Sequence, residues 1–310
     1  PDEFKKSFKD NLFFERDLVV GHRDFEKIAK FINKKKDFYL VTGFASSGEF
    51  HLGHRAIIDL YVYFRKFTKT GNFVICDLDA YVSRPDKKIS SLSEARAYAV
   101  NNISNALSLG VPPSDIVLQS KRDSEYFSLS HEIMKRITFN TMKATLGHTD
   151  LGKFSATCLQ ISDILYPQVR DGGAFTLVPV GIDQDPIVRL ARDVYKKINK
   201  NFDAPSALYI SHVPGMRNPQ EKMSKSGSSI SLIEPLSSIK SLIDGSFTGG
   251  KSTEEEQKLN GGNPEGCPLY QLYRFYHPDS KFVENIYQSC LSGKLLCGSD
   301  KKSALDFLTN

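Results

Sequence analysis

The stretch VTGFASSGEFHLGH, residues 41–54, decides the expected fold. It overlaps the aromatic and β-branched run FYLVTGF, which is typical of a buried strand. The segment ASSG indicates a turn, and AIIDLYVYFRKF from Ala56 onward favours a helix packed on a sheet. His51, Gly53 and His54 are therefore expected at a strand-to-helix junction, where a parallel sheet presents backbone N–H groups and phosphates bind.

Strand-like and helix-like segments alternate along the chain up to about residue 210. Further strands are expected over 72–82, 115–120 and 175–186. Helices are expected over 22–36, 91–110, 127–146 and 153–166, and after residue 186. This alternation predicts an α/β fold with a Rossmann-like, doubly wound parallel sheet.

The sequence changes character after about residue 210. A polar loop, PGMRNPQEKMSKSGSS, is followed by short segments with glycine pairs, in which Ser252 or Thr253 with Glu255 or Glu256 forms a plausible capping box. Apolar helices are then expected over 269–278, 282–293 and 301–308. We expect a catalytic domain over 1–230, with a helical insertion at about 85–170 and a mobile loop over 215–230, and a helical domain over 231–310.

Composition and charge set broad limits on function. The chain has 310 residues, 40% hydrophobic and 25% charged, and a formal net charge of +5, which permits a nucleic-acid partner without requiring one. Its five cysteines form no CxxC pair, which argues against a disulfide framework or a zinc site and for a reducing compartment. The N-terminus is too charged for a signal peptide, and no apolar run reaches the length of a membrane span. We expect a soluble cytoplasmic protein with no membrane partner.

Two short motifs carry chemistry. In HLGH, His51 and His54 are three residues apart on a helix start and can donate hydrogen bonds to a polyphosphate, while Gly53 has no Cβ and lets a flat ring approach. The alternative is a pair of capping or core histidines. In EKMSKS, residues 221–226, Lys222 and Lys225 can close over a nucleotide and stabilise a leaving pyrophosphate. The alternative is a pair of solvated lysines.

HLGH followed by KMSKS on this α/β pattern resembles the two signatures of class I aminoacyl-tRNA synthetases. Four stretches resemble the tryptophanyl enzymes of the archaeal and eukaryotic type: GIDQDPIVRLARD (181–193), ITFNTMKATLG (137–147), GGKSTEEEQKLNGG (249–262) and YQSCLSGKLLCG (287–298). The resemblance runs from about residue 20 to the last residue. Val41 stands where eukaryotic members carry tyrosine, and CDLDAY (76–81) replaces their glutamine and glutamate and is also similar to tyrosyl enzymes.

The resemblance implies ATP-dependent activation of L-tryptophan and its transfer to tRNA(Trp). It implies that the helical insertion of about 85–170 forms a homodimer, with the helices of 127–166 as the expected interface. It also implies an anticodon-binding role for 231–310, although that region has a net charge of −2. Mg²⁺ is expected with the ATP, held mainly by phosphates and water, and no metal ligands are expected in the protein. The implied catalytic residues are His51, His54, Lys222, Ser224 and Lys225. The implied ATP-binding residues are Gly43, Ser46, Ser47, Gly53, Gly181, Asp183, Met223 and Ser226. The implied amino-acid-binding residues are Val41, Asp77, Asp79, Tyr81, Gln160 and Gln184.

Several assignments stay open. A buried indole N–H needs an acceptor, for which Asp77, Asp79, Tyr81 and Gln160 are candidates, and Asp79 or Gln160 could bind the ammonium group instead. Asp183 is either a ribose acceptor or a helix N-cap. Arg189 and Arg192 are expected in structural ion pairs, and the aromatic residues Tyr273, Phe275 and Tyr276 either pack in the core or stack on bases. The rival functions are a tyrosine–tRNA ligase, an HxGH nucleotidyltransferase that uses no tRNA, and a regulatory protein that keeps the fold.

Overall fold

The computed structural model describes residues 2–83, 89–147, 150–171, 175–224 and 228–309, which fall in two compact units. The first unit comprises Val19–Glu49 and Ile57–Ser211, and the second comprises Asp2–Leu18, Phe50–Ala56 and His212–Asn310. Each unit is defined by the contacts among its own residues. The expected division at residue 230 into a catalytic and an anticodon-binding domain stays a prediction.

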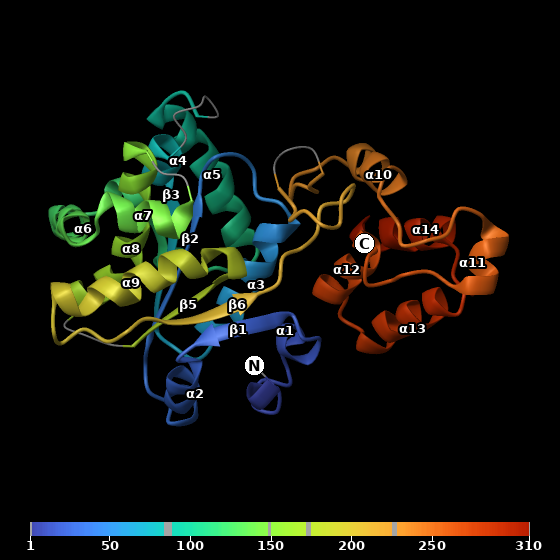
Figure 1. Ribbon diagram of the computed structural model, residues 1–310, viewed down its shortest axis with the longest axis horizontal. Coiled ribbons are helices and arrows are strands. Elements are labelled where there is room, and N and C mark those ends of the chain that lie inside the picture. The colour runs from blue at the N-terminus through green and yellow to red at the C-terminus, as the bar shows by residue number, and fades with distance from the viewer. Residues whose placement is uncertain (1, 84–88, 148–149, 172–174, 225–227, 310) are drawn as a thin grey trace. The chain divides into compact units, whose positions relative to one another are not determined.

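The first unit is built on a six-stranded sheet with the order β1-β6-β5-β2-β3-β4 (Figure 1). The neighbours β6-β5-β2-β3-β4 pair in parallel, and β1 pairs antiparallel with β6. The chain runs outward from β2 through β3 to β4, and on the other side from β5 to β6, so the direction of winding reverses between β2 and β5. The strands are β1 Val19–Arg23, β2 Tyr39–Ala45, β3 Thr70–Cys76, β4 Ile116–Leu118, β5 Thr176–Gly181 and β6 Ser206–Ile210.

Helices cover both faces of this sheet. On one face, Val178, Ala207 and Tyr209 join a hydrophobic cluster with α6, α8 and α9. On the other face, Tyr61 of α3 meets Phe73 of β3 edge to face. The register pairs Phe73 with Thr42, so its side chain points to the face opposite to that of Val41. The helices of this unit are α2 Phe25–Asn33, α3 Leu52–Arg65, α4 Asp77–Val82, α5 Leu92–Ser108, α6 Ser124–Arg136, α7 Phe139–Leu146, α8 Leu151–Asp171 and α9 Asp185–Ile198, of which α3 begins in the second unit.

Four details correct the expected elements. The helix expected over 22–36 begins only at Phe25, because Asp24 has a φ of 50° and separates it from β1. The strand expected over 72–82 ends at Cys76, and Asp77–Val82 form the helix α4. The helix expected over 127–146 is two helices separated at Ile137 and Thr138. The antiparallel edge strand β1 makes the sheet mixed rather than wholly parallel.

The second unit is helical, as expected for the C-terminal part of the chain. Thr253 caps its α11 by accepting a hydrogen bond from the Glu256 N–H at 3.1 Å, which confirms the Thr253–Glu256 capping position. Gly261 ends α11 at a φ of 68°, and a Cβ there would lie 1.8 Å from the Leu291 carbonyl oxygen, so only glycine fits against α13. Its helices are α1 Leu12–Glu15, α10 Leu236–Asp244, α11 Glu254–Asn260, α12 Pro268–Tyr276, α13 Ser280–Leu291 and α14 Cys297–Thr309.

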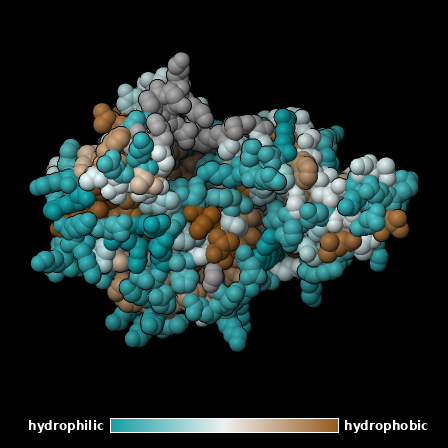
Figure 2. Space-filling model, viewed as in Figure 1, coloured by the Kyte–Doolittle hydropathy of each residue, from teal (hydrophilic) through white to brown (hydrophobic). Residues whose placement is uncertain are grey.

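The surface and the cysteines agree with the composition. The visible face is mostly hydrophilic, and hydrophobic residues reach it in small separate groups (Figure 2). Among the described residues, no helix combines the length and apolar character needed to cross a membrane. All five cysteines are free thiols, and Cys76, Cys158 and Cys267 are buried.

Candidate active site

A pocket of about 510 Å³, part of it open to solvent, lies at the carboxyl ends of β2 and β5, where the winding of the sheet reverses. Crevices of this kind are the usual ligand sites of doubly wound α/β folds. The lining comes from β2, β5, α8, α9, the end of β3 and the first turn of α4. It consists of Val41, Thr42, Gly43, Ala45, Cys76, Asp79, Gln160, Asp163, Ile164, Val178, Val180, Gln184, Ile187 and Val188.

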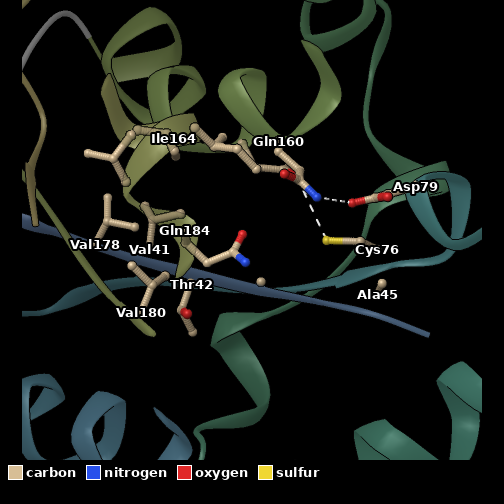
Figure 3. Close-up of a pocket in the computed structure, with 14 residues that line it drawn as sticks. Val41, Thr42, Ala45, Cys76, Asp79, Gln160, Ile164, Val178, Val180 and Gln184 are labelled. Carbon is tan, nitrogen blue, oxygen red and sulfur yellow. Dashed lines mark hydrogen bonds between the residues drawn. The ribbon is translucent and has the colours of Figure 1, made fainter. Parts of the chain in front are cut away.

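The pocket has an apolar side and a polar side (Figure 3). Val41, Val178 and Val180 stand on adjacent strands with Ile164 of α8 above them, and together they form an apolar wall. Gln160, Asp79 and Cys76 lie at the opposite end, and Gln184 lies between the two. Such a pocket suits a flat apolar ring that carries a few polar atoms.

The polar end is a connected set of buried groups. Gln160 donates from Nε2 to Asp79 Oδ2. Gln119, which does not line the pocket, donates from Nε2 to Asp163 Oδ2 at 2.7 Å and accepts from the Asp79 N–H at 3.0 Å. The Cys76 Sγ lies 4.0 Å from the same Asp163 oxygen. The other side-chain oxygens, Gln160 Oε1 and Asp163 Oδ1, are buried without a hydrogen-bond partner among the described residues.

Burial dominates the electrostatics of this end. It raises the pKa of Asp163 from the ordinary 3.8 to about 7, against the lowering effects of Arg122, Gln119 and Tyr126. Burial likewise raises the pKa of the Cys76 thiol, with Asp163 as the next cause. Because the thiol keeps its proton, Cys76 can donate to the Asp163 carboxylate.

The structure brings together most of the residues predicted to bind the amino acid. Val41, Asp79, Gln160 and Gln184 all line the pocket, together with Gly43 from the predicted ATP-binding set. Asp77 does not line it: its carboxylate accepts from the Ser120 N–H at 2.9 Å and from Arg96 Nε at 3.4 Å. Tyr81 is also absent from the lining and is 43% exposed.

Other residues predicted to bind ATP lie on the same sheet edge. Gly43 is exposed, and a Cβ there would lie 3.1 Å from Cys76 Sγ. Ser46 is buried and Ser47 half-buried in the loop after β2. Gly181 ends β5, and the exposed Asp183 accepts from Gln184 Nε2 at 3.1 Å. The N-cap residue of helix α9 is Gln184 rather than Asp183.

The first signature lies in the second unit, where its two histidines are packed together. The rings of His51 and His54 have centroids 3.9 Å apart. The His51 N–H donates to His54 Nδ1 at 3.0 Å, and the Gly53 N–H donates to His51 Nδ1 at 3.1 Å. Since an accepting nitrogen carries no hydrogen, the proton of each neutral ring is on Nε2, a donor suited to phosphate oxygen.

The second signature is part of the same unit. Residues Phe50–Leu52 run alongside 230–232: the Leu52 N–H donates to Ile230 O at 3.0 Å, and the Leu232 N–H donates to Phe50 O at 2.9 Å. The described part of KMSKS comprises an exposed Lys222, a buried Met223 and a half-buried Ser224. A Cβ added to Gly53 would lie 3.7 Å from Met223 Cβ, so the two signatures are neighbours. Lys225 and Ser226 lie outside the described residues.

Other expectations were of structural roles. Arg192 pairs with Asp24 at 2.9 Å, a different partner from its helix neighbour Asp193. Tyr273, Phe275 and Tyr276 are buried, which confirms that they belong to the core. In the part of the chain that is described, no group of three or more His, Cys, Asp or Glu side chains is arranged to hold a metal ion.

Asp163 and Gln119 were not among the residues predicted from the sequence. Asp163 follows Gln160 by three residues on α8, and this spacing puts both side chains on one helix face. That signal was available within the stretch LQISDIL. Gln119 offered none, because its role depends on the register of β4 beside β3.

Similarity to known proteins identifies the family of this chain. The sequence profile described as "tRNA synthetases class I (W and Y)" matches residues 33–310, and the chain belongs to this family. It is 37% identical to the tryptophan–tRNA ligase of Methanocaldococcus jannaschii, over 95% of this chain and 81% of that protein. It is 33% identical to the tryptophan–tRNA ligase of Hyperthermus butylicus, over 99% of this chain and 84% of that protein. The crystal structure of the tryptophanyl-tRNA synthetase of Aeropyrum pernix superposes with a TM-score of 0.90 at 33% identity, covering 99% of this chain and 85% of that one.

Proposed function

We propose that this protein activates L-tryptophan with ATP and transfers it to tRNA(Trp). The observation that carries the proposal is the pocket at the β2–β5 junction, with an apolar wall and a buried carboxylate, in a member of the W and Y family. Two tryptophan–tRNA ligases are 37% and 33% identical to this chain over 95% and 99% of its length. This similarity supports tryptophan rather than tyrosine as the substrate.

In this proposal the apolar wall holds the indole ring. The Asp163 carboxylate accepts the indole N–H, because it is a buried acceptor whose Oδ1 has no partner among the described residues. Asp79 and Gln160 bind the ammonium group, since Gln160 already donates to Asp79 and leaves acceptor oxygens at that end. Asp163 thus replaces the four candidates that the sequence left open for the indole. The assignment of Asp77 and Tyr81 to the amino acid has no support from the lining.

The activation step needs positioning and charge stabilisation more than a protein nucleophile. An oxygen of the tryptophan carboxylate attacks the α-phosphorus of ATP, and pyrophosphate leaves with its electron pair. His51 and His54 donate from Nε2 to phosphate oxygens, while Lys222 and Lys225 stabilise the leaving pyrophosphate, with Ser224, Met223 and Ser226 beside it. Gly43, Ser46, Ser47, Gly181 and Asp183 complete the ATP site. Mg²⁺ enters with ATP, bound by its phosphates and water.

The partners follow from the same proposal. The protein acts in the cytoplasm as a homodimer, and residues 231–310 read the anticodon. Exposed apolar side chains on the expected dimer helices support this assembly: Leu151 on α8 is 82% exposed and Phe139 on α7 is 48% exposed.

Charging of tRNA tests the whole function. Purified protein with ATP, Mg²⁺ and labelled tryptophan is expected to esterify tRNA(Trp) and to leave tRNA(Tyr) uncharged. Formation of tyrosyl-tRNA would establish the tyrosine alternative. Adenylyl transfer without any aminoacyl-tRNA would favour the HxGH nucleotidyltransferase.

A further inference from the structure

Gln119 is a fully buried side chain outside the pocket. It stands in the 3₁₀ turn Gln119–Lys121, directly after β4. Because β4 runs parallel to β3, Gln119 lies at the same sheet edge as Cys76 and the start of α4. A buried amide at such a point needs partners for both of its ends.

The two ends of this amide reach the two pocket carboxylate residues. Nε2 donates to Asp163 Oδ2 at 2.7 Å, and Oε1 accepts the Asp79 N–H at 3.0 Å. The orientation of the amide is fixed, because a carboxylate accepts only and a backbone N–H donates only. Asp163 is therefore held through one oxygen, while its Oδ1 is left without a partner among the described residues.

We propose that Gln119 is a positioning residue that sets which oxygen of Asp163 meets the ring N–H of the substrate and ties this acceptor to the turn that carries Asp79. The inference rests on the proposed function. Gln119 itself contacts no substrate. Loss of the Gln119 side chain is expected to weaken tryptophan binding far more than ATP binding, since the residues proposed to bind ATP lie on other segments.

The effect of pH separates positioning from general damage. Tryptophan binding requires the ionised carboxylate, and the Asp163 pKa lies at about 7, so KM for tryptophan should rise as pH falls below that value. The hydrogen bond from Gln119 lowers this pKa, so its removal should move the rise to higher pH. The titratable and charged groups that act on Asp163 are Arg122, Tyr126, Asp79 and Cys76.

The experiment is tryptophan-dependent ATP–pyrophosphate exchange, measured for the full chain from pH 6 to 9. Gln119→Met removes both hydrogen bonds at similar size. We expect KM for tryptophan to rise about tenfold or more, as for loss of a hydrogen bond to a charged group. KM for ATP should stay within about twofold, and the pH profile for tryptophan should move upward. Unchanged tryptophan KM and pH profile, or an equal rise in both KM values, would overturn the inference.

The chain offers a matched control in Gln168. It is also fully buried on α8, and it donates to Asp203 O at 2.9 Å and accepts the Asp203 N–H at 2.7 Å. Gln168→Met likewise removes one donated and one accepted hydrogen bond, here to the backbone of a residue outside the pocket, and should leave both KM values and the pH profile unchanged. A shift equal to that of Gln119→Met would show that loss of any buried amide has this effect, and would overturn the inference.

A second variant covers the case in which Gln119→Met does not fold. Gln119→Glu keeps the size and the acceptor for the Asp79 N–H, and it donates to Asp163 only when protonated. We expect its tryptophan KM to approach that of the wild type near pH 6 and to worsen toward pH 9, the reverse of the wild-type trend. A profile parallel to the wild type would refute the inference. Failure of wild-type protein to exchange with any amino acid would instead remove the proposed function, and this inference with it.

Discussion

Asp163 lowers the stability of the folded protein when it is ionised, and in the proposed function its charge serves to bind the substrate. Its carboxyl group is 5% exposed, and burial raises its pKa to about 7. The folded chain therefore holds a proton between about pH 4 and 7 that the unfolded chain has lost, so this group makes the free energy of unfolding fall as pH rises through that range. Above pH 7 the folded protein contains a buried charge that opposes folding and that, in the proposed function, accepts the indole N–H.

Removal of the Asp163 charge is expected to raise stability and to lower activity. Asp163→Asn should raise the free energy of unfolding at pH 8 by a few kcal/mol, with the difference from wild type disappearing near pH 4. Tryptophan-dependent exchange should fall about tenfold or more, because the acceptor loses its charge. Urea unfolding at the two pH values and exchange at pH 8 measure both. A variant that is less stable at pH 8 and fully active would contradict the assignment.

Gly53 leaves room for the His51 ring because it has no Cβ. A Cβ at this position would lie 2.9 Å from His51 Cε1, closer than real Cβ atoms come, and 3.0 Å from His51 Nδ1, which is a tight contact. Gly53→Ala should therefore displace the His51 ring and lower the exchange rate about 100-fold, the cost of a misplacement of about 1 Å. Gly298→Ala, where a Cβ meets nothing within 4 Å, is the control and should keep full activity. Full activity in Gly53→Ala would mean that His51 is not needed where the structure has it.

At the scale of elements, the helix α4 forms where the local sequence pattern predicted a strand, because contacts with a distant segment fix its first turn. The run NFVICDLDAYV was predicted to be one strand that ends in acidic and aromatic residues, but the strand ends at Cys76 and a helix begins at Asp77. The Asp79 N–H donates to Gln119, and the Asp77 carboxylate accepts from the Ser120 N–H, so the turn after β4 fixes the first turn of α4. These bonds join segments about 40 residues apart, and a sequence window contains no sign of them.

The sheet itself was predictable where strands are long and apolar. The β2 segment and the helix after it appear where FYLVTGF and AIIDLYVYFRKF indicated, and with them the edge that holds Val41 and Gly43. The short edge strand β1 was lost inside an expected helix, because only the left-handed backbone of Asp24 separates the two. The family resemblance implied Gln160, which lines the pocket, whereas its link to Asp79 depends on the packing of α8 on α4.

The junction of α3 with β4 depends on one buried carboxylate. Asp115 is 2% exposed and accepts from Tyr61 Oη at 2.9 Å and from Arg65 Nε at 2.6 Å. Asp115→Ala leaves both donors without this acceptor and should cost about 3–5 kcal/mol of unfolding free energy. Asp193→Ala, at an exposed position of α9, should change it by less than about 0.5 kcal/mol. Equal urea midpoints for the two variants would show that this junction does not depend on Asp115.

At the scale of the whole molecule, the proposed dimer requires that exposed apolar residues of α7 and α8 become buried between two chains. Leu151→Glu puts a charge at a side chain that is 82% exposed, so it should not disturb the fold of one chain but should convert a dimer to monomers. Leu259→Glu is the control, since Leu259 is 83% exposed on α11, outside the insertion of about 85–170. Light scattering after size exclusion gives the masses. A monomeric wild type, or a dimeric Leu151→Glu, would refute this interface.

Amino-acid-dependent ATP–pyrophosphate exchange, run with each amino acid separately, tests the central claim most directly. It needs no tRNA, and it measures activation of the amino acid by itself. The account predicts exchange with tryptophan and none with tyrosine or any other amino acid. Exchange with tyrosine alone, or with no amino acid at all, would contradict it.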